Sequence, residues 1–193
     1  WLTYICYEYE FLDESLFTAI YIFDNFISAT KQEENSYIAA VCSLWISFKL
    51  NETMIPTLEQ MVSICNNSFS SSQIQEFEIL ILNTLHFDIV YPTPTHISDS
   101  LLSQVPVDET FEKYVSLFCH CALFSEDLIG LTPSHISFAS IILAKIATST
   151  KIGLNVITRS LSFIHEVTLI HCLKSISYQL KRIFQCTPNA IKI

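Results

Sequence analysis

The stretch Tyr37-Ile-Ala-Ala-Val-Cys-Ser-Leu-Trp-Ile-Ser-Phe-Lys-Leu-Asn-Glu52 carries no charge until Lys49. Apolar residues at three- and four-residue spacing mark two faces of a helix: Ile38, Val41, Trp45 and Phe48 on one, and Ala39, Cys42 and Ile46 on the other. A helix that is apolar nearly all round is typical of a central helix, packed by neighbours on several sides. We predict this helix from 35 to 50, with Lys49 in its last turn.

A second stretch has the same small and apolar character, Ser134-His-Ile-Ser-Phe-Ala-Ser-Ile-Ile-Leu-Ala144. The first half of the chain has predicted helices at 1–10, 12–27, 35–50, 57–65 and 70–85. The second half has them at 96–104, 108–126, 134–148, 155–165 and 168–184. Because each central helix takes the third place in a set of five, the sequence predicts an all-α fold of two tandem five-helix units.

Short signals support these boundaries. Asp13 is predicted to cap the second helix, and Ser70 followed by Gln73 has the form of a capping box at the start of the fifth. Two apolar stripes are predicted to be buried: Leu16, Ile20, Phe23 and Ile27 in the second helix, and Ile74, Phe77, Leu80 or Ile81, and Leu85 in the fifth. The segment Phe87-Asp-Ile-Val-Tyr-Pro-Thr-Pro94 holds two prolines, which stop helices, so we predict the joint there, between units at 1–90 and 91–193.

Composition excludes several classes of protein. The 193 residues include 19 acidic and 10 basic ones, for a net charge of -9, and an acidic surface disfavours nucleic acid as a partner. Two glycines leave little room for phosphate-binding loops. No apolar run reaches the roughly 18 to 20 residues of a membrane span, so no membrane partner is predicted. With Trp1 first and no signal-peptide pattern, we expect the sequence to be an excerpt of a longer chain.

The seven cysteines are predicted to be free and mostly to fill the core: Cys6, Cys42, Cys65, Cys119, Cys121, Cys172 and Cys186. An odd number without a C-x-x-C pair argues against both a disulfide framework and a zinc ribbon. Neighbouring residues on a helix point about 100° apart, so Cys119-His120-Cys121 is not expected to converge on a metal. We therefore predict no metal and no cofactor, and a reducing compartment inside the cell, in the nucleus, the cytoplasm or both.

Catalytic motifs are missing from the sequence. It has no glycine-rich phosphate loop, no G-x-S-x-G elbow and no H-E-x-x-H helix. Its acidic pairs fall at predicted helix ends or loops, where a solvated charge is the default: Asp13-Glu14, Glu33-Glu34 and Glu126-Asp127. The chain is therefore not expected to be an enzyme.

In order and spacing, these segments resemble the cyclin family, and most closely its A/B, mitotic-type members. The helix at 13–27 is similar to the second helix of the first cyclin box, including Asp24 near its end. Phe48-Lys-Leu-Asn-Glu52 stands where cyclins carry a Ser-Lys-x-Glu-Glu signature. The segments 77–82 and 85–88 match the pattern that closes the first box, and Tyr91-Pro-Thr-Pro94 falls on the linker between boxes. The likeness covers nearly the whole chain and is specific in the first half.

The resemblance implies the cyclin fold and a noncatalytic subunit that binds and activates a cyclin-dependent serine/threonine kinase, so controlling cell-cycle progression. A cyclin binds the active arrangement of the kinase better than the inactive one and shifts the population toward it. The resemblance assigns Lys49 and Glu78 to opposite rims of the kinase-binding groove. It assigns Leu50, Leu82 and Phe87 to apolar contacts with the kinase. From the residues alone, Lys49 and Glu78 are also explained as solvated helix charges.

Further positions carry over with departures from the family pattern. Asp24 corresponds to a structural polar residue that cyclins pair with an arginine of the preceding helix. Trp1 and Tyr37 fall on a patch through which some cyclins dock substrates, but Tyr4 replaces the acidic residue of that patch. Asn51 replaces an acid of the signature, which could alter the choice of partner. Trp1 is alternatively explained as a core residue.

An alternative function keeps the fold and changes the partner. A divergent cyclin-fold binding or scaffold protein, related to transcription, would grip DNA through several Lys or Arg side chains aimed at phosphates. The densest basic cluster is the pair Lys181-Arg182. Salt-sensitive binding to DNA would favour this alternative over a kinase partner.

Overall fold

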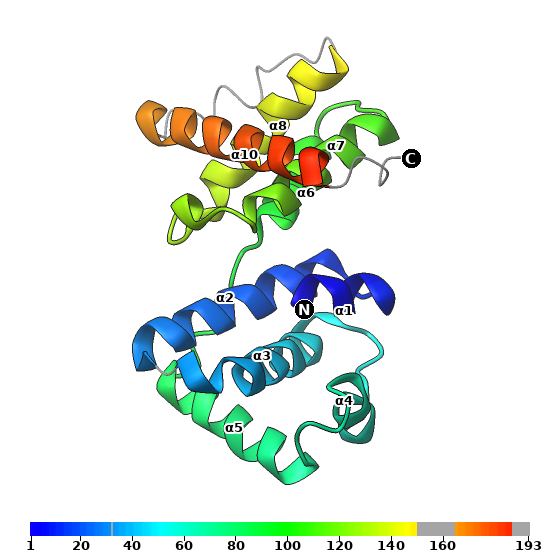
Figure 1. Ribbon diagram of the computed structural model, residues 1–193. Helices are drawn as coiled ribbons and strands as arrows, with labels where there is room; N and C mark the ends of the chain where they lie inside the picture. The colour runs from blue at the N-terminus through cyan, green and yellow to red at the C-terminus, as the bar shows by residue number, and fades with distance from the viewer. Residues whose placement is uncertain (32, 150–164, 187–193) are drawn as a thin grey trace. The chain divides into compact units, whose positions relative to one another are not determined.

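The computed structural model describes residues 1–31, 33–149 and 165–186. All regular structure in these ranges is helical, which confirms the all-α prediction. The chain forms two compact units, one of residues 1–93 and one that begins at Pro94 (Figure 1).

The first unit contains five α-helices and one short 3-10 helix. Their bounds are α1 Leu2–Glu8, α2 Asp13–Thr30, η1 Glu33–Asn35, α3 Ser36–Asn51, α4 Leu58–Ile64 and α5 Ser71–Thr84. Each corresponds to a helix expected from the apolar spacing, apart from η1. The helix α3 packs against both α2 and α5, as a central helix should (Figure 1).

Burial along α3 follows its apolar pattern. Every residue from 41 to 48 is buried, and exposure begins at Lys49 and Leu50 in the last turn. This confirms the predicted central helix. In α2 the most deeply buried stripe is shifted from the expected one: it includes Ala19, Ile22 and Phe26, whereas Ile20, Phe23 and Ile27 are half-buried. The helix is apolar on more than one face, so spacing alone did not decide which face meets α3.

The start of α2 is held from a distant part of the chain. Its N-cap is Leu12, which makes no side-chain cap, so the predicted capping role of Asp13 is wrong. Instead Glu52, just past α3, accepts hydrogen bonds through Oε1 from the Leu12 amide at 2.9 Å and the Ser15 hydroxyl at 2.6 Å. A carboxylate at a helix start satisfies free N–H groups and favours the helix dipole.

Helices α4 and α5 both start with a capping box. Ser70 accepts from the Gln73 amide while the Gln73 side chain accepts from the Ser70 amide, as predicted. Thr57 and Gln60 make the same reciprocal pair at the start of α4. Local side-chain chemistry therefore fixes where both helices begin.

The second unit is built around α8 Pro133–Thr148, which packs against α6 Pro94–Leu102, α7 Glu109–Ala122 and α10 Glu166–Cys186. The 3-10 helix η2 Glu126–Leu128 follows α7. The predicted helix at 155–165 lies outside the described residues, except for His165, which is not helical. The linker between the units was expected to run from 87 to 94, but it ends one residue earlier because Pro94 is the first residue of α6. In the described ranges, no helix is long and apolar enough to cross a membrane.

Candidate functional site

The end of α3 faces the middle of α5. One turn before the site, the Cys42 thiol donates to the Ile74 carbonyl at 3.4 Å. Burial, and then the negative charge of Glu78, raise the pKa of this thiol to about 12, while Lys49 opposes the shift. Steps of three and four residues along α3 and four along α5 then bring Trp45 and Lys49 opposite Glu78.

These three side chains form one cluster. The Lys49 ammonium lies 2.6 Å from Glu78 Oε1 and 2.8 Å from Oε2. The Trp45 indole Nε1–H donates to Glu78 Oε2 at 3.1 Å. The same ammonium lies 4.5 Å from the centroid of the Trp45 ring, a cation–π distance. The Glu78 carboxylate thus accepts three hydrogen bonds, and Trp45 contacts both members of the ion pair.

The two charges are therefore partners, not opposite rims of a groove, which corrects the sequence-based expectation. Apolar periodicity placed each residue on its helix but said nothing of the distance between the helices. The two side chains also differ in exposure to water: that of Lys49 is 37% exposed and that of Glu78 is 15% exposed. An ammonium has three donors, so after two bonds to Glu78 one N–H of Lys49 remains for a partner's acceptor.

Large apolar side chains close to this cluster in sequence are exposed. Leu50, which follows Lys49, is 47% exposed, and Phe87 is 64% exposed. Leu82, one turn beyond Glu78 on α5, is half-buried. Exposed Ile79, directly after Glu78, was not predicted. Leu80 is also exposed and Ile81 fully buried, which resolves the open choice between them.

Phe87 is held outward by an unusual helix end. After α5 the backbone turns through His86 at φ 51° and Phe87 at φ 60°, and the Phe87 amide donates to the Leu82 carbonyl at 2.9 Å. Left-handed residues other than glycine cost on the order of 1 kcal/mol or more each. Asn66 and Asn67 make the same kind of turn after α4, so this is a helix end that the chain uses more than once. At α5 it leaves a phenylalanine exposed to water.

The other sequence-based candidates lie in the same unit. Trp1 and Tyr37 come together edge to face, with ring centroids 5.5 Å apart, and both are exposed rather than in the core. The Tyr37 hydroxyl donates to the Cys65 carbonyl at 3.3 Å. Tyr4, in place of the acidic residue, is also exposed. The geometry thus assembles an aromatic patch without its carboxylate.

Asp24 is half-buried in α2, and burial raises the pKa of its carboxyl above the ordinary value. Nearby, the rings of Tyr21 and Tyr91 stack with centroids 4.3 Å apart. Burial raises the pKa of the Tyr91 hydroxyl to about 12, with smaller contributions from Tyr21 and Asp24. Asp24 therefore sits where α2 meets the segment that follows α5.

The cysteines Cys119 and Cys121 are both buried, which confirms that they fill the core. Between them, His120 pairs through Nδ1 with the Ser116 carbonyl at 2.9 Å, one turn back on its own helix. Across the described ranges, no group of three or more His, Cys, Asp or Glu side chains is arranged to hold a metal ion.

Known proteins share both the sequence pattern and the architecture. Residues 1–90 match the family described as "Cyclin, N-terminal domain". Cyclin-B2-2 of Oryza sativa subsp. indica is 27% identical over 146 residues, which are 75% of this chain and 35% of the relative. G2/mitotic-specific cyclin-B2 of Mesocricetus auratus is 30% identical over 144 residues, or 72% of this chain and 36% of the relative. The chain thus spans about a third of the length of these curated relatives.

The fold is also found in solved structures. A viral cyclin from herpesvirus saimiri superposes with a TM-score of 0.81 at 17% identity, over 96% of this chain and 83% of the viral one. A chain of the CAK complex from Chaetomium thermophilum, bound to ATP-gamma-S, gives a TM-score of 0.73 at 18% identity, over 98% of this chain and 64% of that one. At these identities the likeness establishes the fold, which confirms the predicted cyclin architecture.

Proposed function

Because this chain belongs to the cyclin family, we propose that it is a regulatory subunit that binds and activates a cyclin-dependent serine/threonine kinase. It has no turnover of its own in this proposal and acts in cell-cycle progression, as the names of its mitotic relatives suggest. The kinase-binding residues are Lys49, Leu50, Glu78, Leu82 and Phe87.

One observation carries the proposal: the chain holds a preformed ion pair and, close to it in sequence, exposed apolar side chains. Leu50 and Phe87 each leave about half or more of their surface in water, which disfavours the free chain and would be relieved by a partner. The Lys49–Glu78 pair is already organised by Trp45, so little side-chain entropy remains to be lost on binding.

The apolar side chains and the ion pair would contribute differently to kinase binding. Apolar contacts would supply most of the affinity, because their burial is favourable and non-directional. The ion pair would set the orientation of the partner, because its remaining N–H and its carboxylate accept only certain placements. A helix held in one orientation is what a population shift toward an active kinase requires.

A binding and activity assay tests the proposal. The purified chain should raise phosphorylation of a peptide by co-purified cyclin-dependent kinase and show no phosphorylation alone. The double variant Lys49→Ala/Glu78→Ala should weaken kinase binding by about 2 kcal/mol or more, or about 30-fold in Kd.

The chain offers a matched control. Lys113 and Glu109 form another ion pair, at 2.8 Å and largely exposed, in the second unit. The variant Glu109→Ala/Lys113→Ala removes the same two residue types and should leave kinase binding unchanged. Equal binding by wild type and the Lys49/Glu78 variant would refute the assigned surface.

A further inference from the structure

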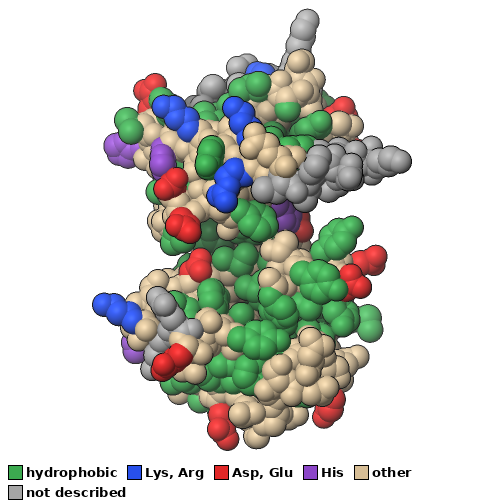
Figure 2. All heavy atoms as spheres, in the orientation of Figure 1, with side chains coloured by type: hydrophobic (Ala, Val, Ile, Leu, Met, Phe, Trp, Pro, Cys, Tyr) green, Lys and Arg blue, Asp and Glu red, His purple; other side chains and the backbone are tan. Residues whose placement is uncertain are grey.

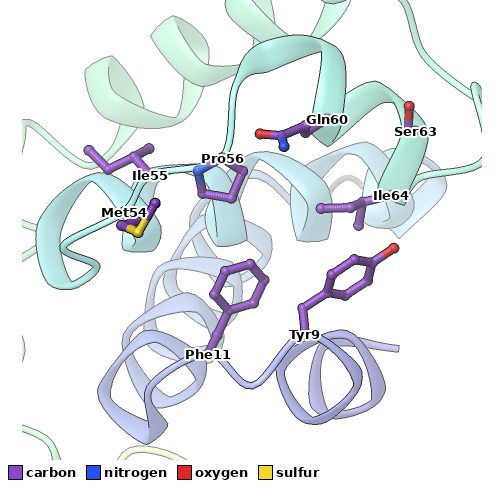
Figure 3. A pocket seen from close by; sticks show the side chains of 8 residues that line it. All are labelled: Tyr9, Phe11, Met54, Ile55, Pro56, Gln60, Ser63 and Ile64. Atoms are coloured by element: carbon purple, nitrogen blue, oxygen red, sulfur yellow. The ribbon is translucent and has the colours of Figure 1, made fainter.

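A concave surface lies at the opposite end of α1 from Trp1. This open pocket of about 380 Å³ is lined by the α1–α2 loop, the α3–α4 loop and α4 (Figure 3). The aromatic rings of Tyr9 and Phe11 form one wall, Met54 to Pro56 another, and Ser63 and Ile64 of α4 a third. We call this cavity the Phe11 pocket. It shares no residue with the kinase-binding set or with the Trp1–Tyr37 patch.

The wall formed by Tyr9 and Phe11 packs on the core of the first unit. The Phe11 ring packs on fully buried Phe48, with centroids 4.1 Å apart, and Tyr9 stacks on Phe11 at 6.0 Å. The loop that presents both rings turns sharply at Glu10, whose φ is 53°, and the Phe11 amide donates to the Cys6 carbonyl at 2.9 Å. A pocket held in shape by core packing can bind without first being ordered.

Its mouth exposes apolar surface to water. Met54 is 86% exposed, and Ile55 and Tyr9 are both exposed as well. Figure 2 shows hydrophobic side chains gathered on the face of the first unit around α1, with acidic side chains at the edge of the group. Contiguous apolar surface of this kind, rimmed by charge, is typical of a site that a partner covers.

A hydrogen-bond donor stands at the same mouth. Gln60 lines the pocket, and its Oε1 accepts from the Thr57 amide at 2.6 Å in the capping box. This bond holds the side-chain oxygen of Gln60 and so sets the orientation of its side-chain amide. The two N–H donors of that amide remain for a ligand. A main-chain carbonyl of an extended peptide is a suitable acceptor.

Charge defines which peptide would fit. The first unit carries twelve Asp or Glu and two Lys, so the whole acidic excess of the chain lies in it. Two exposed acidic residues are next to lining residues along the chain: Glu10 comes between Tyr9 and Phe11, and Glu59 comes one helical turn before Ser63 on α4. The Ser63 hydroxyl donates to the Glu59 carbonyl at 3.1 Å, which confirms this one-turn relation.

We propose that the Phe11 pocket binds an extended peptide segment of a protein other than the kinase, with one bulky apolar side chain in the pocket and Lys or Arg on either side of it. The apolar side chain contacts Phe11, Pro56 and Ile64. The flanking cations face Glu10 and Glu59, and the Gln60 amide donates to the peptide backbone. Opposite charges steer the encounter, and burial of the apolar side chain holds the complex.

A peptide array tests this chemistry with the intact chain. One set of nonapeptides has Leu, Ile, Met, Phe or Trp at the centre between Lys and Arg residues. Matched sets replace the central residue by Ser, or the flanking cations by Glu. We expect binding to the apolar and basic set alone, weaker in high salt because exposed charges are screened. Equal binding of the acidic and basic sets would overturn the proposal.

Variants then locate the binding. Ser63→Trp fills the pocket from an exposed position, and Met54→Ser removes apolar surface at its mouth; both should weaken the best peptide at least about tenfold, a change of about 1.4 kcal/mol. Glu10→Gln/Glu59→Gln should weaken it severalfold and flatten the salt dependence. The control Glu34→Gln/Glu76→Gln removes two other exposed carboxylates of the same unit and should change neither.

Two further readouts separate this proposal from other outcomes. Ser63→Trp should leave kinase binding intact, and Lys49→Ala/Glu78→Ala should leave peptide binding intact, so either proposal can fail alone. If light scattering showed a dimer that Ser63→Trp dissolves, the occupant would be a second copy of the chain and the peptide proposal would be wrong. Unchanged peptide binding by both pocket variants with native melting temperatures would also refute it.

Discussion

Trp45 shows how one residue can take a role that its neighbours in sequence do not indicate. In the apolar pattern of α3 it is one of several large residues on a buried face, and it is indeed buried. Its indole edge, however, donates to Glu78, while its ring face lies under the Lys49 ammonium. Phenylalanine or leucine would fill similar space without the N–H, so the identity of this residue matters to the ion pair.

A double-mutant cycle measures that role. We expect Trp45→Phe and Glu78→Gln to be coupled by about 1 to 2 kcal/mol in the free energy of unfolding, because Trp45→Phe removes a hydrogen bond to a charged group. Urea unfolding followed by circular dichroism, on wild type, both single variants and the double variant, provides the measurement. The cycle subtracts the cavity that the smaller ring leaves behind.

The control for this cycle is Trp1→Phe with Glu78→Gln. Trp1 contacts Tyr37 rather than the ion pair, so these two changes should add within about 0.5 kcal/mol. A coupling energy for Trp45 no larger than that for Trp1 would show that Trp45 does not position Glu78.

Helix ends are the distinctive feature at the scale of the elements. Several helices end in a residue with left-handed backbone angles, a place that glycine usually takes. The chain has only two glycines, so other residues take this place. In the described part of the chain, positive φ values occur at seven residues other than glycine: Glu10, Lys31, Asn66, Asn67, His86, Phe87 and Ser149. The strain is spread over several helix ends. Two of these residues lie at proposed sites: Glu10 is next to lining residues of the Phe11 pocket, and Phe87 is one of the proposed kinase-binding residues.

Lys31 provides a test of this strain away from both sites. It ends α2 at φ 56° and ψ 25°, and its amide donates to the Ile27 carbonyl at 2.7 Å. Lys31→Gly should stabilise the chain by about 1 kcal/mol, because glycine adopts this conformation without steric cost. Thermal unfolding should therefore shift upward by a few degrees.

Lys31→Ala is the matched control, since it removes the same side chain and charge but keeps the Cβ atom. It should give no stabilisation. If the alanine variant were as stable as the glycine variant, the gain would come from losing the lysine and not from relieving the backbone.

The whole molecule repeats one plan twice. Each unit has an apolar helix, α3 or α8, that packs against at least two other helices of its unit, and each unit has its own core. Each core contains three buried free cysteines: Cys6, Cys42 and Cys65 in the first unit, and Cys119, Cys121 and Cys172 in the second. Burial raises the pKa of Cys6 and Cys42 to about 12 and that of Cys121 to about 11.

Thiol labelling tests this two-core organisation. At pH 8 these six thiols should resist iodoacetamide, because all six are buried. Burial also raises the pKa of the Cys6, Cys42, Cys121 and Cys172 thiols above the ordinary value. As urea is raised, the three cysteines of one unit should become reactive together, since each core opens as a cooperative group. Mass spectrometry of tryptic peptides gives the reactivity of each site. Cysteines of one unit that react at clearly different urea concentrations would contradict a single core there.

Much of the fold followed from local sequence. The spacing of apolar residues predicted α3 and α8 as central helices, the Ser70–Gln73 box predicted where α5 starts, and ordered motifs indicated the cyclin family. These succeed because helix period and capping chemistry involve residues within a few positions of each other. Lys49 in the last turn of α3 was predictable for the same reason.

Contacts between helices were decided by the tertiary structure. Sequence did not show that Lys49 and Glu78, 29 positions apart, are bonded to each other and to Trp45, or that Glu52 holds the start of α2. Nor did it show that Tyr9, Phe11 and Pro56 line a pocket. A helical period determines which way a side chain points from its own axis. The distance to a side chain on another helix depends on how the two axes pack, which the whole core sets.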